Sequence, residues 1–93
     1  MVELNRVRMV VSGSVQGVGF RMFIHREAHE LKLTGSVKNR PEGTVEIDAQ
    51  GTLEQLDELF RRARRGPTRS RVTSISKEEQ SPDSTLDRFT IIG

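Results

Sequence analysis

The chain has 93 residues, of which 33% are hydrophobic and 30% are charged, with no cysteine and a net charge of +2. The composition excludes disulfide bridges, thiol catalysis and thiolate metal sites, and no apolar run approaches the roughly 20 residues of a membrane-spanning helix. This length supports one modest hydrophobic core, so we expect a single domain over residues 1–93. We expect a cytoplasmic monomer with no membrane partner, and the small net charge does not indicate nucleic-acid binding by itself.

Residues 6–14 predict a first strand, because apolar and charged residues alternate along them. From residue 20 to residue 32 the apolar spacing changes to that of an amphipathic helix. The apolar side chains of its expected buried face are Phe20, Phe23, Ile24, Ala28 and Leu31. Glu27 falls in the same arc, and the sequence offers no explanation for it. We expect Gly35 to terminate this helix.

Residues 36–40 and 44–49 predict two short strands around the turn signal Pro-Glu-Gly at 41–43, which indicates a hairpin. A second helix is expected to begin after Thr52, which forms a capping-box pattern with Gln55. The apolar stripe of this helix is expected to consist of Leu53, Leu56, Phe60 and Ala63. The helix should end near the Gly66-Pro67 pair.

Two further strands are expected at 71–79 and 88–92, with a polar loop at 80–87 between them. The resulting β-α-β-β-α-β order, with an extra C-terminal strand, predicts an α+β fold of the ferredoxin-like sandwich type. In this fold an antiparallel sheet carries both helices on one face. The first two strands run parallel with the third between them, so their carboxyl ends lie about 10 Å apart. We therefore expect loop 15–19 to lie near Asn39.

The connection between the first strand and the first helix, SGSVQGVGFR at 12–21, has features of an anion site. Gly17 and Gly19 permit a turn whose backbone N–H groups converge, and the start of the helix adds further donors. Arg21 can turn its guanidinium onto the same anion. The stretch is neither a Walker A loop nor a dinucleotide fingerprint, because no Gly-Lys-Ser/Thr follows and position 22 is methionine. The loop alone is a weak signal, since glycines after a strand are more often structural.

Together with other stretches, this loop closely resembles the acylphosphatase family. The stretches that carry the resemblance are SGSVQGVGFR at 12–21, GSVKN at 35–39, EGTVE at 42–46 and Gly66-Pro67. The resemblance covers residues 7–92 and implies the same ferredoxin-like sandwich that the element order predicts.

The resemblance also implies residue roles. Arg21 would bind the phosphate and Asn39 would orient the attacking water, as the two catalytic residues. The loop residues whose amides would hold the phosphoryl oxygens are Gln16, Gly17, Val18, Gly19 and Phe20. We expect their N–H groups to matter more than their side chains. Thr44 is a candidate supporting residue. Many family members have Tyr in place of Met22 and Trp in place of Ser36, two positions that we expect to flank the site.

Other groups of polar residues favour structural interpretations. His25 and His29 lie four residues apart but lack the H-E-x-x-H pattern, so we interpret them as surface histidines. The pairs Glu27-Glu30 and Glu78-Glu79 are interpreted as solvated charges. Six arginines lie within residues 61–71. The first four of them lie at the end of the second expected helix, which has acidic residues at its start and basic residues at its end, as the helix dipole favours. RNA-binding sheets of this fold expose aromatic residues, whereas three of the four phenylalanines here lie on apolar helical faces.

We therefore expect an acylphosphatase, a hydrolase that cleaves the carboxyl-phosphate bond of a small-molecule acyl phosphate without a metal or cofactor and without a nucleic-acid partner. The alternative is a non-catalytic phosphate- or RNA-binding module of the same fold.

Overall fold

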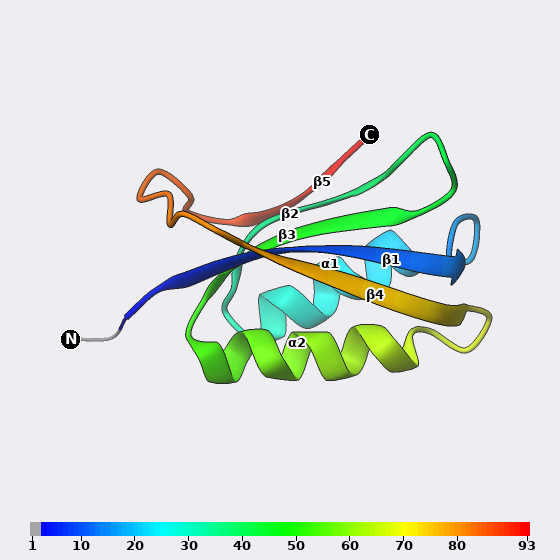
Figure 1. The fold of residues 1–93 in the computed structure, drawn as a ribbon, viewed down its shortest axis with the longest axis horizontal. Coiled ribbons are helices and arrows are strands. Elements are labelled where there is room, and N and C mark those ends of the chain that lie inside the picture. Colours follow the sequence, from blue (N-terminus) through cyan, green and yellow to red (C-terminus); the bar gives the residue numbers. More distant parts are fainter. Residues whose placement is uncertain (1–2) are drawn as a thin grey trace.

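The computed structural model describes residues 3–93, so residues 1 and 2 of the expected domain lie outside the described residues. Its elements in chain order are β1 (Asn5–Ser14), α1 (Phe20–Glu30), β2 (Thr34–Asn39), β3 (Val45–Gly51), α2 (Leu53–Arg65), β4 (Arg71–Gln80) and β5 (Phe89–Ile92). Every expected element is present in the expected order. Both helices lie on the same side of the sheet (Figure 1).

The sheet has the strand order β4-β1-β3-β2-β5. The first four strands pair antiparallel, and β1 and β2 flank β3 as the ferredoxin-like plan requires. β5 pairs parallel with β2, so the complete five-stranded sheet is mixed. The expected α+β fold is confirmed, and the structure adds the partner of the last strand.

The hydrophobic core lies between the sheet and the two helices. The helical side chains that are fully or almost fully buried in it are Phe20, Ile24, Ala28, Leu56, Leu59 and Ala63. The expected stripe of α2 is wrong at Leu53, whose side chain is 60% exposed. The helix is rotated so that Leu59 faces the sheet, which places Leu53 and Phe60 at the margin of the buried face.

The expectation that Gly35 terminates α1 is wrong. The helix ends at Glu30, and Lys32 takes the left-handed conformation there, with φ of 62°. Gly35 instead lies within β2, opposite Ala49 of β3. A Cβ at Gly35 would stand 1.8 Å from the carbonyl oxygen of Asp48. The glycine is therefore required by the close approach of a neighbouring strand.

An ion cluster around Arg62 joins the two helices and explains Glu27. The Arg62 guanidinium lies 3.1 Å from Glu27, 2.6 Å from Glu30 and 2.9 Å from Glu58. The Glu27 side chain is only 19% exposed, so its interpretation as a solvated charge is wrong. Hydrogen bonds from Arg61 and Arg62 lower the pKa of Glu58 below its ordinary value. Glu27 occupies the apolar arc because α2 supplies a cation there.

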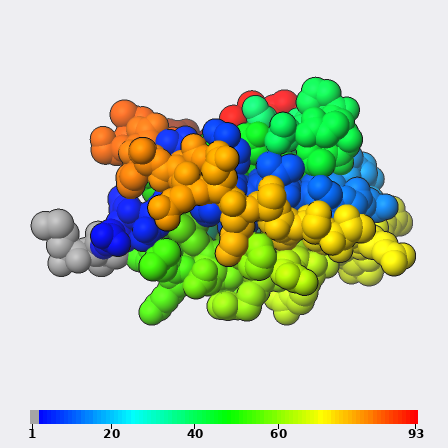
Figure 2. Space-filling view, in the orientation of Figure 1, coloured from blue at the N-terminus to red at the C-terminus, as the bar shows by residue number. Residues whose placement is uncertain are grey.

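The connection between β4 and β5 runs from one edge of the sheet to the other, at the end opposite loop 15–19 (Figure 1). In the space-filling view its residues (orange) pack against this end of the molecule (Figure 2). Gln50 holds it in place, because its side-chain amide donates to the Asp83 carbonyl at 3.0 Å and accepts from the Asp83 N–H at 2.8 Å. This connection allows β5 to lie beside β2 and to end near the candidate site.

Candidate active site

Loop 15–19 and the end of β2 lie at the same end of the sheet, close to the β2–β3 turn (Figure 1). A hollow of about 90 Å³ lies between them. The residues that line it are Val15, Gly17, Gly19, Phe20, Arg21, Met22 and Asn39. The structure thus brings Arg21 and Asn39 to one small cavity, as the strand topology predicts. Thr44 and Ser36 do not line it, whereas Met22 does and is 63% exposed.

The two loop glycines adopt left-handed backbone conformations, with φ of 74° at Gly17 and 78° at Gly19. A Cβ at either position would meet no atom within 4 Å, so the requirement for glycine is conformational rather than steric. Gly19 is also the N-cap of α1, where no side chain caps the helix and the first turn carries no acidic residue.

The N-terminus of α1 therefore retains free hydrogen-bond donors. The first helical bond runs from the Phe23 N–H to the Gly19 carbonyl at 3.0 Å. Helical bonding leaves the N–H groups of Phe20, Arg21 and Met22 without an i−4 partner. Such groups, together with the helix dipole, form an anion site when they face a cavity.

Replacement of Gly19 by valine tests this loop conformation. A β-branched residue in the left-handed region costs on the order of 1–3 kcal/mol, so the loop should relax and redirect its amides. We expect the inhibition constant of inorganic phosphate to rise about 10-fold, whereas the far-ultraviolet circular dichroism spectrum stays unchanged. Gly43→Val is the matched control, because Gly43 also has a positive φ and open space but lies outside the hollow. Equal phosphate inhibition of Gly19→Val and wild type would contradict the role assigned to the loop backbone.

Arg21 is partly buried at the start of α1, and its guanidinium Nη1 donates to the main-chain oxygen of Gly93. This contact anchors the side chain between the hollow and the end of β5. Among residues 3–93 no carboxylate side chain lies within ion-pair distance of Arg21. Its remaining N–H donors are therefore available to an anion in the hollow.

Asn39 is the last residue of β2, where it lies opposite Val45 of β3. Its side chain is partly exposed and forms no hydrogen bond with the part of the chain that the structure describes. The amide therefore has both a donor group and an acceptor free at the edge of the hollow.

Gln16 makes a contact that the sequence did not indicate. Its side-chain Nε2 donates to the carbonyl oxygens of Arg40 and Thr44, at 2.8 and 2.9 Å. The Thr44 hydroxyl donates to Glu42 at 3.0 Å, within the same turn. Gln16 and Thr44 thus take part in joining the loop to the β2–β3 turn.

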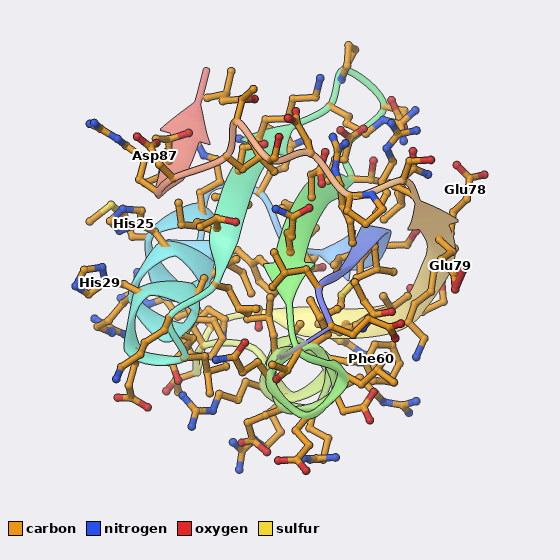
Figure 3. The ribbon with its side chains drawn as sticks, turned by 90° about the vertical axis from the view of Figure 1, so that its left-hand side faces the viewer. His25, His29, Phe60, Glu78, Glu79 and Asp87 are labelled. Carbon is orange, nitrogen blue, oxygen red and sulfur yellow. The ribbon has the colours of Figure 1, made fainter. Side chains whose placement is uncertain are left out.

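The rival groups of polar residues remain apart from this hollow. His25 and His29 project outward from α1 (Figure 3), and the His25 ring packs 6.4 Å from the ring of Phe89. Residues 3–93 contain no group of three potential metal-ligating side chains. Glu78 and Glu79 project from β4, and Glu78 lies 3.7 Å from Arg8.

The arginine-rich segment 61–71 is partly engaged in structural contacts. Arg61 and Arg62 both pair with Glu58. The Phe60 ring lies 5.9 Å from the guanidinium of Arg64 and 4.2 Å from the ammonium of Lys77. The ring is therefore engaged by cationic side chains and is not presented for stacking on a nucleic-acid base. Neither helix of the described residues is long and apolar enough to cross a membrane.

Comparisons of the sequence and of the structure with known proteins identify the same family. The acylphosphatase family model matches residues 7–91. An acylphosphatase from Chlorobaculum tepidum is 52% identical over 87 residues, which cover 94% of this chain and 95% of that protein. The crystal structure of acylphosphatase from Bacillus subtilis has a TM-score of 0.92 at 42% identity, covering 98% of this chain and 100% of that one. An acylphosphatase structure from Coxiella burnetii has a TM-score of 0.91 at 34% identity, with coverages of 96% and 93%.

Proposed function

The chain belongs to the acylphosphatase family and is a hydrolase of acyl phosphates, and we propose that Arg21, the amides of loop 16–20 and Asn39 perform the reaction. The observation that supports this assignment is the shared hollow, which is lined by residues of an uncapped helix N-terminus, by Arg21 and by Asn39. The non-catalytic alternative is not favoured by these relationships.

The phosphoryl group would occupy the Arg21 side of the hollow. Phosphoryl transfer passes through a loose transition state whose charge is spread over the peripheral oxygens. Backbone N–H groups and a guanidinium that are already oriented toward those oxygens stabilise this charge without reorganisation. Arg21 and the loop amides would therefore supply most of the electrostatic stabilisation.

Asn39 would hold the attacking water in line with the bond that breaks. The water oxygen attacks phosphorus, the bond between phosphorus and the acyl oxygen breaks, and the carboxylate leaves with the bonding electron pair. A carboxylate is a weak base and needs no proton to depart. None of the side chains that line the hollow is a carboxylate or an imidazole. We therefore assign the proton of the water to a phosphoryl oxygen of the substrate.

Hydrolysis of benzoyl phosphate by the wild-type protein tests the substrate class and the metal independence together. We expect release of benzoate and inorganic phosphate at a rate that EDTA does not change, with inorganic phosphate as a competitive inhibitor. Loss of activity in EDTA, with recovery on addition of a divalent cation, would contradict the metal-independent reaction. An absence of hydrolysis would contradict the proposed catalytic role of this site.

We further propose that the protein is a cytoplasmic monomer, that residues 1–93 form a single domain, and that this domain binds no nucleic acid. The ion pairs of Arg61 and Arg62 support the last point, because they occupy part of the basic segment. Analytical ultracentrifugation with and without RNA at low salt would test both oligomeric state and RNA binding.

A further inference from the structure

No strand pairing joins loop 15–19 to the β2–β3 hairpin at the level of the hollow. Pairing between β1 and β3 ends at Val11, opposite Val45. Beyond that point β1 pairs only with β4, through Ser12, Gly13 and Ser14. Loop 15–19 therefore lies beyond the last pairing between β1 and β3. That pairing is the connection of the loop, through β3, to β2, the strand that carries Asn39.

Gln16 provides the hydrogen bonds that cross this gap. Its Nε2 reaches the carbonyl oxygens of Arg40 and Thr44, so both N–H bonds of one amide group are used on the turn. In the described chain no other hydrogen bond joins residues 15–19 to residues 39–44.

The two acceptor carbonyls belong to Arg40 and Thr44, the residues that close the β2–β3 turn. The Arg40 N–H donates to the Thr44 carbonyl at 2.9 Å, and the Gly43 N–H donates to the Arg40 carbonyl at 3.0 Å. Arg40 directly follows Asn39, and Thr44 directly precedes Val45, which is the register partner of Asn39. The Gln16 side chain thus binds the two turn residues that adjoin β2 and β3, immediately beyond Asn39.

We propose that Gln16 is a positioning residue whose side chain sets the separation between the phosphate-binding loop and Asn39. This inference rests on the proposed function, since it assigns Gln16 to the geometry of the water that Asn39 holds. The bonds are exposed to solvent, and each neutral hydrogen bond contributes about 0.5–1.5 kcal/mol to stability. Their importance lies in geometry, because a displacement of about 1 Å in a reacting group can cost about 100-fold in rate.

Gln16→Met tests the proposal, because methionine has a similar length and lacks both donors. We expect kcat for benzoyl phosphate to fall by about 10-fold or more, since the hairpin is free to shift Asn39 away from the loop. The inhibition constant of inorganic phosphate should stay within about twofold, because Arg21 and the backbone amides remain. Gln80→Met is the matched control, because Gln80 is a glutamine on β4 that bonds only to Glu78 through its side chain. Thermal melting of each variant reports whether the fold is retained.

A double-mutant cycle with Asn39→Ala separates positioning from a general structural effect. If Gln16 acts through Asn39, then Gln16→Met should change kcat by less than about twofold in the Asn39→Ala background. An equal fall in both backgrounds, a weakened phosphate inhibition with normal kcat, or no effect at all would overturn the positioning role. A strong defect of Asn39→Ala with a harmless Gln16→Met would overturn this role alone. Full activity of Asn39→Ala would overturn the proposed function of Asn39 and the positioning role with it.

Discussion

Arg21→Ala is expected to lower kcat/KM for benzoyl phosphate by on the order of 10³-fold, the low end of the effect of an arginine on the transferred phosphoryl group. Arg21 lines the hollow, and without its guanidinium the backbone amides alone would have to balance the phosphoryl charge. Both phosphate inhibition and turnover should weaken. The measurement is the steady-state hydrolysis of benzoyl phosphate, together with the inhibition constant of inorganic phosphate.

Arg21→Lys and Arg26→Ala provide the controls for this substitution. Lysine keeps the charge but lacks the planar fork of donors, so we expect an activity between those of the wild type and Arg21→Ala. Arg26 lies on the same helix with a side chain that is 73% exposed, and its replacement should leave kcat/KM unchanged. Wild-type turnover by Arg21→Ala would remove this residue from the mechanism.

Asn39→Ala is expected to lower kcat by on the order of 10²-fold, the typical effect of removing one oriented hydrogen-bonding group from a reacting centre. The substitution deletes the free amide at the edge of the hollow but leaves Arg21 and the helix N-terminus in place. We therefore expect inorganic phosphate to inhibit this variant as strongly as it inhibits the wild type. The loss should thus appear in kcat, in contrast to the combined loss of Arg21→Ala.

Asn5→Ala is the matched control, because Asn5 is an asparagine at the far end of the sheet, at the start of β1. It should retain wild-type kcat. A loss of phosphate inhibition in Asn39→Ala, in proportion to the loss of turnover, would show that Asn39 binds the phosphate rather than the water.

Local patterns predicted much of the fold correctly. The capping box of Thr52 and Gln55 is formed by reciprocal bonds at 3.2 and 2.8 Å, as the spacing of these residues indicates. The strand order places Asn39 at the same hollow as Arg21, as the β-α-β-β-α-β order predicts. These features depend on neighbouring residues or on a small set of allowed topologies, so one sequence contains the necessary information.

The errors arose where a distant segment decides the environment of a residue. Lys32, just after the end of α1, takes the left-handed conformation expected of Gly35, and Gly35 serves the contact with β3. The expected stripe of α2 missed Leu59, because the rotation of a helix about its axis depends on the surface beneath it. Glu27 lies in the apolar arc of α1 because Arg62, on the other helix, pairs with it.

The sequence by itself determined the left-handed glycines of loop 15–19, the order of the elements and hence the sharing of one hollow by Arg21 and Asn39. Backbone preference and the pattern of apolar residues act over a few positions, so they can be read along the chain. Only the tertiary structure decided the pairing of β5 with β2, the ion cluster around Arg62 and the contact of Gln16 with the hairpin turn. The last contact joins residues 24 and 28 positions apart. A glutamine side chain can satisfy its donors in many places, and only the folded chain places two backbone carbonyls within its reach.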